Sequence, residues 1–241
     1  METKSLYDGR RTTMAGLPDI LHYRTEEIAF LRPTQFAVGL REVAAKRRKI
    51  EKRAGHSTAF MDRQLPVILG PGRQLYLRDC HHYAIALFQS GVERVHISID
   101  ADLSQLDPDM FWMTLAARSW VRPIDGLGER HPFEHMPVNV FALEDDPFRS
   151  LAGALRRRGL YAKTDIAYAD FIWADFLRCR IASACVADDF EGSVDRAERI
   201  IRADPEAWHL PGLREGAEMA RSPATSRSRP GPSPDASQSS A

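Results

Sequence analysis

The sequence has no excess of either charge and no long apolar run, and each absence excludes a class of protein. Its 241 residues contain 33 Lys and Arg and 33 Asp and Glu, so the net charge gives no support for binding nucleic acid or membrane surfaces through global charge. The longest apolar stretches, such as residues 66–69, are only a few residues long. A membrane-spanning helix needs about 20 apolar residues, so we expect no membrane segment.

Cysteines are also few, and two common nucleotide-binding motifs are missing. Cys80, Cys179 and Cys185 form no CxxC pair, which argues against a disulfide framework and a cysteine-rich zinc site. Charged residues interrupt the first thirty positions, where a secretory signal would need an apolar core. We therefore expect a cytoplasmic protein with reduced thiols. Neither GxGxxG nor GxxxxGKS/T occurs, so a dinucleotide-binding fold and a P-loop have no support.

Between its two ends, the sequence contains an ordered succession of strand and helix patterns. The ends themselves show no apolar periodicity of the kind that forms a core. Residues 1–25 are predicted to form a loose arm. Residues 221–241 contain seven Ser and four Pro but no Leu, Ile, Val, Met or aromatic residue, which predicts a disordered tail. Between these ends we expect an α+β domain over residues 26–125 and a mainly helical part over residues 126–220.

The order of the predicted elements supports this α+β class rather than a doubly wound sheet. Helices are predicted over residues 41–53, 79–89, 108–120, 147–158, 166–184 and 194–203, and strands over residues 64–69, 74–77, 95–99 and 138–141. The turn Gly70-Pro71-Gly72 predicts a hairpin between the first two strands. Asp79 and Asp146 are the predicted N-caps of the helices that follow them.

The turn between this hairpin and the next helix, Arg78-Asp79-Cys80-His81-His82, is the most informative segment for function. Backbone amides at a helix N-terminus bind anions, so we expect a phosphate site here with His81 and His82 as further donors. Asp79 and His82 share a helix face at a spacing of three residues and could hold a metal ion. The alternative is a capped helix with two polar residues at its exposed start.

Three further candidates each have a functional and a purely structural interpretation. Lys46 lies in a basic helix with seven Lys or Arg against two Glu, which could contact phosphates or form a solvated face. Glu42, one turn earlier, is either its ion-pair partner or a general base. Asp100 and Asp102 end a predicted strand and could hold Mg²⁺ or cap the next helix.

Aromatic and charged residues nearer the C-terminus have simpler interpretations. Phe171, Trp173 and Phe176 recur at helical spacing and are predicted to be core residues. Arg149 follows the predicted cap Asp146 by three residues and could reach the site, although we expect it to pair with an acidic residue.

Several short motifs follow one another in a specific order between residues 31 and 180. They are Leu31-Arg32-Pro33-Thr34-Gln35, Gly39 with Glu42-Val43 and Lys46, Leu75-Tyr76, Asp79 with His81-His82 and Ala86-Leu87, Asp102-Leu103-Ser104, Phe111-Trp112, Asp145-Asp146-Pro147-Phe148-Arg149-Ser150-Leu151, and Phe171-Ile172-Trp173-Ala174-Asp175-Phe176. This series resembles the putative ParB-like nuclease family of the ParB/sulfiredoxin superfamily.

The resemblance implies a ParB/sulfiredoxin-like fold that binds nucleotide phosphates at residues 79–82, and a hydrolase acting on phosphate esters of nucleic acid or nucleotide. It implies catalytic roles for Glu42, Asp79 and His82, with phosphate contacts from Lys46, Cys80, His81 and His82. ATP or CTP and Mg²⁺ are the cofactors to expect, with Asp102 as a metal ligand. The alternatives are a small-molecule kinase of the serine type that uses ATP or ADP, and a nucleotide-binding module without catalysis.

Overall fold

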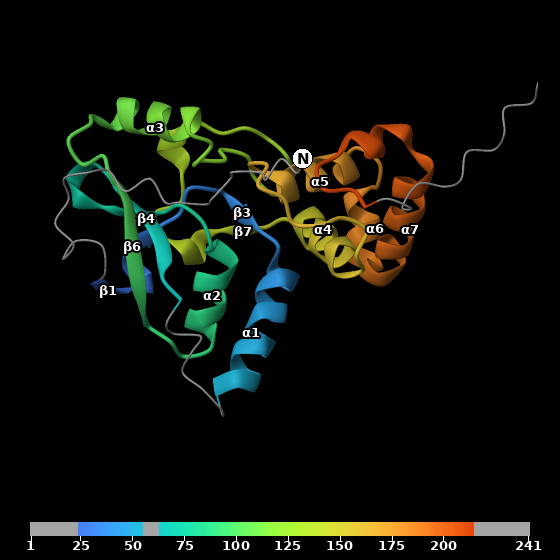
Figure 1. The fold of residues 1–241 in the computed structure, drawn as a ribbon, viewed down its shortest axis with the longest axis horizontal. Coiled ribbons are helices and arrows are strands. Elements are labelled where there is room, and N and C mark those ends of the chain that lie inside the picture. Colours follow the sequence, from blue (N-terminus) through green and yellow to red (C-terminus); the bar gives the residue numbers. More distant parts are fainter. Residues whose placement is uncertain (1–23, 55–62, 215–241) are drawn as a thin grey trace, which may run out of the picture.

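The computed structural model describes residues 24–54 and 63–214, which form a sheet region followed by a helical region (Figure 1). The described residues contain a five-stranded sheet with the order β1-β6-β4-β5-β2. These strands are β1 (Arg24–Glu27), β2 (Leu31–Arg32), β4 (Leu65–Leu69), β5 (Leu75–Leu77) and β6 (Arg94–Asp102). Strand β4 pairs antiparallel with β5 and parallel with β6, so the predicted hairpin is confirmed in a mixed sheet.

One face of the sheet packs against helices α1 (Leu40–Ala54) and α2 (His81–Gln89). Alternation along β6 places Val95, Ile97 and Ile99 in this core, while the residues between them are mostly exposed. Val67 and Leu69 of β4 join the same core. Apolar residues spaced by two along both strands therefore explain why α1 and α2 cover this face.

The other face of the sheet packs against helix α3 (Pro108–Ala117). Ile68 and Tyr76, which alternate with the residues of the first core, contact Phe111 and Leu115 in a second cluster. Asp107 caps α3 by accepting a hydrogen bond from the backbone N–H of Met110 at 3.0 Å. The sheet thus lies between two layers of helix.

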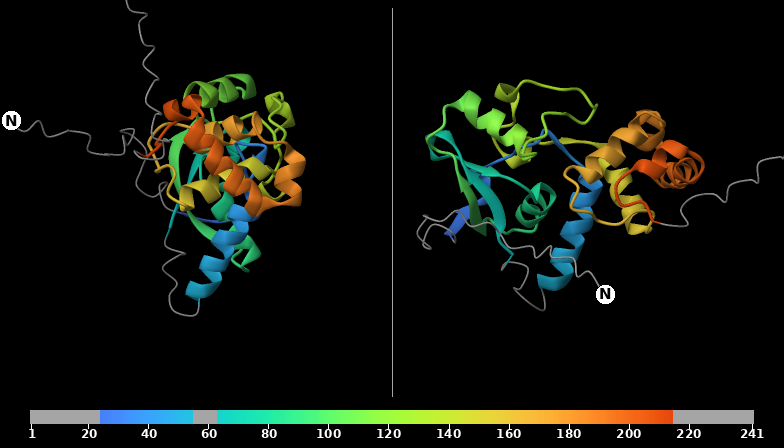
Figure 2. Two further views of the ribbon diagram at one scale, coloured as in Figure 1. Left: turned by 90° about the vertical axis from the view of Figure 1, so that its right-hand side faces the viewer. Right: turned by 45° about the horizontal axis from the view of Figure 1, so that its top comes forward.

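The helical region contains α4 (Pro147–Arg157), α5 (Ala169–Arg178), α6 (Ser183–Asp188) and α7 (Phe190–Ala203), with its own apolar cluster from Phe148 to Ala207. Figures 1 and 2 show it to one side of the sheet, with α1 next to α4. A short parallel pair, β3 (Ala37–Val38) with β7 (Glu144–Asp145), connects the two regions. The predicted fold class, an α+β domain followed by a helical part, is confirmed.

Three local predictions are wrong, each for a local reason. The predicted strand at residues 138–141 is the 3-10 helix η5 (Val140–Ala142), because the Asn139 side chain accepts hydrogen bonds from the amides of Phe141 and Ala142. The predicted helix 166–184 is divided into α5 and α6 by the extended residue Ala182. Helix α3 ends at Ala117 because Ser119 adopts a left-handed conformation with φ of 55°.

The predicted boundaries are only partly covered by the described residues. The tail at 221–241 and residues 1–23 of the predicted arm lie outside them. The domain boundary after residue 125 stays a prediction, although the apolar clusters divide between Leu143 and Phe148. Among the helices that the structure describes, none is both long enough and apolar enough to cross a membrane.

Candidate functional site

A pocket of about 530 Å³ lies between the sheet region and helices α4 and α5. Its walls carry six cationic side chains, which come from both regions: Arg78, Arg118, Arg122, Arg149, Arg156 and Lys163. The carboxylates in the lining are Asp79, Asp165 and Asp170. We call this space the arginine pocket. Its excess of cations favours an anionic ligand.

Arg149 is the most buried cation of the arginine pocket. It lies in the first turn of α4, where the Asp146 side chain accepts hydrogen bonds from the amides of Phe148 and Arg149. The Arg149 guanidinium carbon lies 3.4 Å from the ring centroid of Phe171, and the residue is only 7% exposed. Its Nη1 atom is buried without a hydrogen-bond partner among the described residues. Burial lowers the pKa of Arg149, although Asp170 and Asp146 oppose this effect.

Two more arginines of the pocket have a buried donor without a partner. The Nε atoms of Arg78 and Arg122 are buried and donate to no acceptor in the described chain. One outer nitrogen of each is paired, since Arg78 Nη2 lies 2.7 Å from Asp100 and Arg122 Nη2 pairs with Asp175. A buried N–H without an acceptor costs free energy. Both guanidinium groups therefore lie in the pocket wall with a buried donor that no group of the described chain uses.

The N-terminus of α2 forms another part of the pocket wall. Its N-cap is Cys80, which has a left-handed conformation with φ of 70° and makes no side-chain capping bond. The predicted N-cap role of Asp79 is therefore wrong: Asp79 Oδ1 accepts a hydrogen bond from the amide of Cys80 at 2.6 Å, one residue too early. The backbone amides of His81 and His82 remain without an acceptor in the described chain, as an anion site at a helix N-terminus requires.

Both histidine side chains accept hydrogen bonds from the backbone. His81 Nε2 accepts from the amide of Thr34 at 3.1 Å, and His82 Nε2 accepts from the amide of Gly39 at 3.0 Å. Burial lowers the pKa of His81 to about 3. Burial, helped by Arg149 and Lys46, lowers the pKa of His82 well below its ordinary value. Both rings are therefore neutral at pH 7 with the proton on Nδ1, and they attach residues 34–39 to α2.

Glu42, Lys46 and Cys80 lie near this helix end but do not line the pocket. Glu42 is 8% exposed and pairs with Arg157. Burial lowers the pKa of Lys46, and the nearby Glu42 carboxylate partly offsets this. Cys80 Sγ lies 3.1 Å from Arg63 Nη2, while burial raises the pKa of its thiol. The phosphate contacts predicted for Lys46 and Cys80 stay predictions.

The predicted metal ligand Asp102 lies away from the pocket lining, at the end of β6. Its Oδ1 accepts hydrogen bonds from the amide and hydroxyl of Ser104 at 3.0 and 2.6 Å, and these bonds lower its pKa. Asp100, its predicted companion, pairs with Arg78 instead. Within residues 24–54 and 63–214, neither aspartate belongs to a group of three metal-binding side chains. The observed contacts of the two aspartates are those of a turn and an ion pair, and the metal role of Asp102 stays a prediction.

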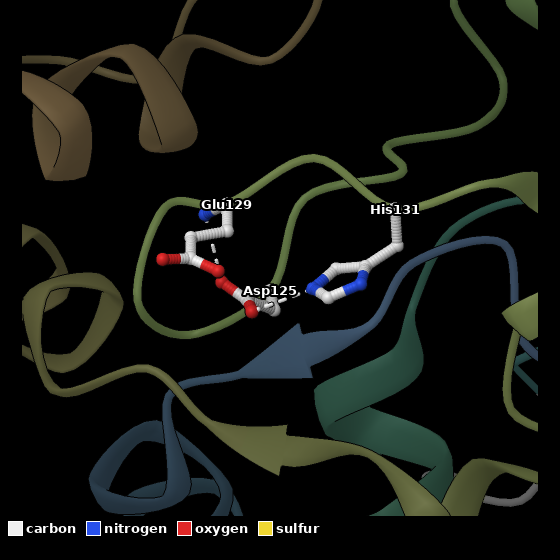
Figure 3. Close-up of side chains that lie close together, drawn as sticks. All are labelled: Asp125, Glu129 and His131. Atoms are coloured by element: carbon white, nitrogen blue, oxygen red, sulfur yellow. Dashed lines mark hydrogen bonds and ion pairs between the residues drawn. The ribbon is translucent and has the colours of Figure 1, made fainter.

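Asp125, Glu129 and His131 form the group of possible metal ligands that the described residues do contain (Figure 3). Asp125 Oδ1 accepts from the amides of Leu127 and Glu129, both at 2.9 Å, and its Oδ2 lies 2.7 Å from His131 Nε2. Burial raises the pKa of Asp125, but these hydrogen bonds outweigh it and lower the pKa overall. The contacts account for the buried carboxylate as a loop-stabilising group.

Sequence reasoning found the helix end and offered Arg149 as a residue that could reach it, but missed the other arginines of the pocket. The structure brings Asp79, His81 and His82 to the pocket lining together with Arg149, which lies over Phe171. Phe171 is half-buried at the pocket, while Trp173 and Phe176 are core residues as predicted. The signal was present in the motifs around Arg149 and Phe171, but residue spacing alone does not bring two helices together.

The comparisons with known proteins define the class to which this fold and pocket belong. A family model described as "Putative ParB-like nuclease" matches residues 24–179, and the chain belongs to this family. The crystal structure of protein Atu1540 from Agrobacterium tumefaciens is similar over 80% of this chain and 97% of that chain, with 42% sequence identity and a TM-score of 0.73. The predicted resemblance is thus confirmed.

A more distant match carries no weight. The C-terminally truncated chromosome-partitioning protein ParB from Caulobacter crescentus, complexed with CTP-γ-S, has 11% identity over 77% of this chain and 95% of that chain. Its TM-score of 0.28 is too low to support an argument. No curated protein gives a significant match.

Proposed function

We propose that this protein binds the phosphate groups of a nucleotide or nucleic acid in the arginine pocket and cleaves a phosphate ester there. One observation carries the proposal: six cationic side chains, among them the buried Arg149, line one pocket whose lining has only three carboxylates. Arginine presents its donors in a planar fork that matches phosphate oxygens, so phosphate is the anion that this arrangement best fits.

The remaining lining supports a nucleotide rather than a bare inorganic anion. Trp120, Tyr168 and Phe171 line the pocket beside the arginines and offer ring surfaces on which a base could stack. A volume of about 530 Å³ lies within the usual range of roughly 300–1,000 Å³ for small-molecule sites. The free amides at the start of α2 would bind one phosphate, and the arginines would bind its neighbours.

Asp79 is the residue that we propose as general base. It is exposed, lines the pocket and stands two residues before His81, whose amide begins the free end of α2. A carboxylate at this position would take a proton from a water molecule that attacks the bound phosphate. The catalytic roles predicted for Glu42 and His82 stay predictions. Glu42 is outside the lining, and His82 Nε2 already accepts a backbone hydrogen bond.

A nucleotide-binding module without catalysis is the second candidate. It is favoured by the two histidines, because both Nε2 lone pairs are occupied by backbone amides. On this alternative the pocket would retain its ligand without proton transfer, and ligand binding would be the whole function.

Calorimetric titration with pyrophosphate, ATP, CTP and a single-stranded oligonucleotide tests the binding. Arg149→Gln removes a buried charged donor and should weaken binding at least about 10-fold. Arg196→Gln, an exposed position on α7, is the matched control and should leave affinity unchanged. If the wild-type protein binds none of these anions, the proposal is wrong.

Turnover then separates the two candidates. Hydrolysis of labelled oligonucleotide and nucleotides, and phosphorylation of free serine, would each be measured with and without Mg²⁺. We expect hydrolysis, and Asp79→Asn should reduce it about 10²- to 10⁴-fold while ligand affinity changes little. Binding without any turnover would establish the non-catalytic module, and serine phosphorylation would establish the kinase.

A further inference from the structure

A chain of four ionic side chains runs behind the arginine pocket. Arg178 Nη2 lies 2.7 Å from Asp146 Oδ2, and Arg178 Nη1 lies 2.5 Å from Asp175 Oδ1. The second oxygen of Asp175 pairs with Arg122 Nη2. Asp146, Arg178 and Asp175 do not line the pocket. The ionic chain therefore connects three residues outside the pocket lining to Arg122, which belongs to it.

Each end of this ionic chain is connected to an arginine whose guanidinium group lies over the Phe171 ring. At one end, Asp146 caps the first turn of α4 through the amides of Phe148 and Arg149, which fixes the backbone that carries Arg149. At the other end, Arg122 has its guanidinium carbon 5.2 Å from the Phe171 ring centroid. Phe171 and Asp175 are both on α5, so one helix provides the ring and the carboxylate that locate the arginines.

The chain is protected from solvent over most of its length. The side chains of Asp146, Arg178 and Arg122 are 5%, 15% and 18% exposed, whereas that of Asp175 is 42% exposed. Exposed ion pairs contribute little, but a largely buried network with short contacts holds its members in one geometry. An arginine used to bind phosphate needs such support, because its long side chain otherwise has many rotamers.

We propose that Asp175 is a positioning residue, which orients the guanidinium groups of Arg122 and, through Arg178 and Asp146, of Arg149 for phosphate binding. This inference rests on the proposed function of the arginine pocket. It assigns a role to the Asp175 of the Phe171-Ile172-Trp173-Ala174-Asp175-Phe176 motif without giving Asp175 any contact with the ligand.

The sign of the effect distinguishes positioning from simple electrostatics. Asp175 carries a negative charge near an anion site, so removing that charge should strengthen anion binding if Coulomb repulsion alone operated. If Asp175 instead holds Arg122 in place, Asp175→Asn should weaken binding, because the guanidinium group loses its fixed orientation. The two explanations therefore predict changes in opposite directions.

A double-mutant cycle with pyrophosphate as the probe tests this proposal. Asp175→Asn should weaken pyrophosphate binding by about 5- to 10-fold in the wild-type background and by only about 2-fold when Arg122→Gln is already present, because the route through Arg178 and Asp146 to Arg149 then remains. A merely structural effect on α5 would give the same loss in both backgrounds. Asp195→Asn is the matched control, because it removes one exposed carboxylate on α7 that pairs with Arg158 away from the pocket.

The possible outcomes distinguish failure of the Asp175 positioning role from failure of the proposed function of the arginine pocket. Loss of pyrophosphate binding in Arg149→Gln together with unchanged or tighter binding in Asp175→Asn would overturn the positioning role alone. Equal losses from Asp175→Asn in the two backgrounds would overturn it as well. Failure of the wild-type protein to bind pyrophosphate or any nucleotide would instead refute the proposed function, and the positioning role with it.

Discussion

Gly39 and Ser150 are in close contact where the start of α1 meets the start of α4. A Cβ atom added at Gly39 would lie 2.8 Å from the backbone nitrogen of Ser150 and 2.7 Å from its Oγ. Ser150 Oγ also lies 3.2 Å from the amide of Arg41, from which it accepts a hydrogen bond. Because the amide of Gly39 donates to His82, this one contact joins α1, α2 and α4 beside the arginine pocket.

Gly39→Ala should therefore destabilise the protein by about 1–3 kcal/mol, the usual cost of overpacking, since a backbone atom must move. Urea denaturation measures the change. Gly91→Ala also adds one Cβ atom, but it meets nothing within 4 Å there. Its cost should be limited to about 1 kcal/mol from the left-handed backbone at Gly91. A smaller loss at Gly39 than at Gly91 would contradict the close contact.

The buried histidines predict that the free energy of unfolding decreases in acid. The pKa of His81 is about 3 in the folded protein and about 6.5 when unfolded. Between these values the unfolded chain binds the extra proton, so stability is complete above pH 6.5 and decreases as the pH falls below it. His81 alone should cost about 2 kcal/mol at pH 5 relative to pH 8, and His82 acts in the same direction.

Denaturation at pH 8, 7, 6 and 5 tests this dependence. Replacing both His81 and His82 by Gln keeps an acceptor but removes the titrating group, so the decrease between pH 7 and pH 5 should become much smaller. His96→Gln, at an exposed position on β6, should leave the decrease unchanged. Burial raises the pKa of Asp146, which opposes the decrease as the pH falls, but Asp146 is the same in all of these variants, so their differences report the histidines. A profile that His81 and His82 do not alter would show that other groups cause it.

The left-handed backbone at Cys80, the N-cap of α2, should make glycine more stabilising than alanine at this position. Its φ of 70° lies in the left-handed region, where a residue with a Cβ atom pays about 1–2 kcal/mol. Cys80→Gly should therefore be more stable than Cys80→Ala by about 1 kcal/mol in thermal or urea unfolding. At Cys185, inside α6, the order should reverse because alanine is the better helix former. The same order at both positions would exclude backbone conformation as the cause.

The fold could be predicted from the sequence wherever one local pattern decides an element. The hairpin around Gly70-Pro71-Gly72 and the Asp146 cap of α4 were correct, because turn residues and capping side chains act over a few positions. The 3-10 helix at Val140–Ala142 was missed because two bonds to Asn139 outweigh the strand pattern of its apolar residues.

The site was less accessible to sequence reasoning because two separate regions build it. The helix after the hairpin could be predicted, although it begins at His81 and not at Asp79, and its N-terminal end lines the pocket. Arg149 and Phe171 are 22 positions apart, and only the packing of α4 against α5 places one on the other. The helical spacing of Phe171 fits a core residue as well as a pocket residue, so periodicity could not show which of the two it is.

The contact between Arg149 and Phe171 gives the last prediction, which concerns ligand binding. A partly desolvated arginine over an aromatic ring gains about 2 kcal/mol, and the ring also limits where the guanidinium group can lie. Phe171→Leu keeps an apolar side chain but removes the ring face. We therefore expect pyrophosphate and nucleotide affinity to decrease by about 10-fold in calorimetric titration, because Arg149 loses its fixed orientation.

Phe176→Leu is a matched control on the same helix. The Arg180 guanidinium carbon lies 3.6 Å from the Phe176 ring centroid, nearly the distance of the Arg149 pair, but neither residue lines the pocket. Phe176 is buried, so its replacement should lower the unfolding free energy while affinity stays within about 2-fold of wild type. Equal losses of affinity in the two variants would show that a general weakening of α5 is responsible. A loss confined to Phe171→Leu would show that the ring acts through the pocket arginines that lie over it, Arg149 at 3.4 Å and Arg122 at 5.2 Å from its centroid.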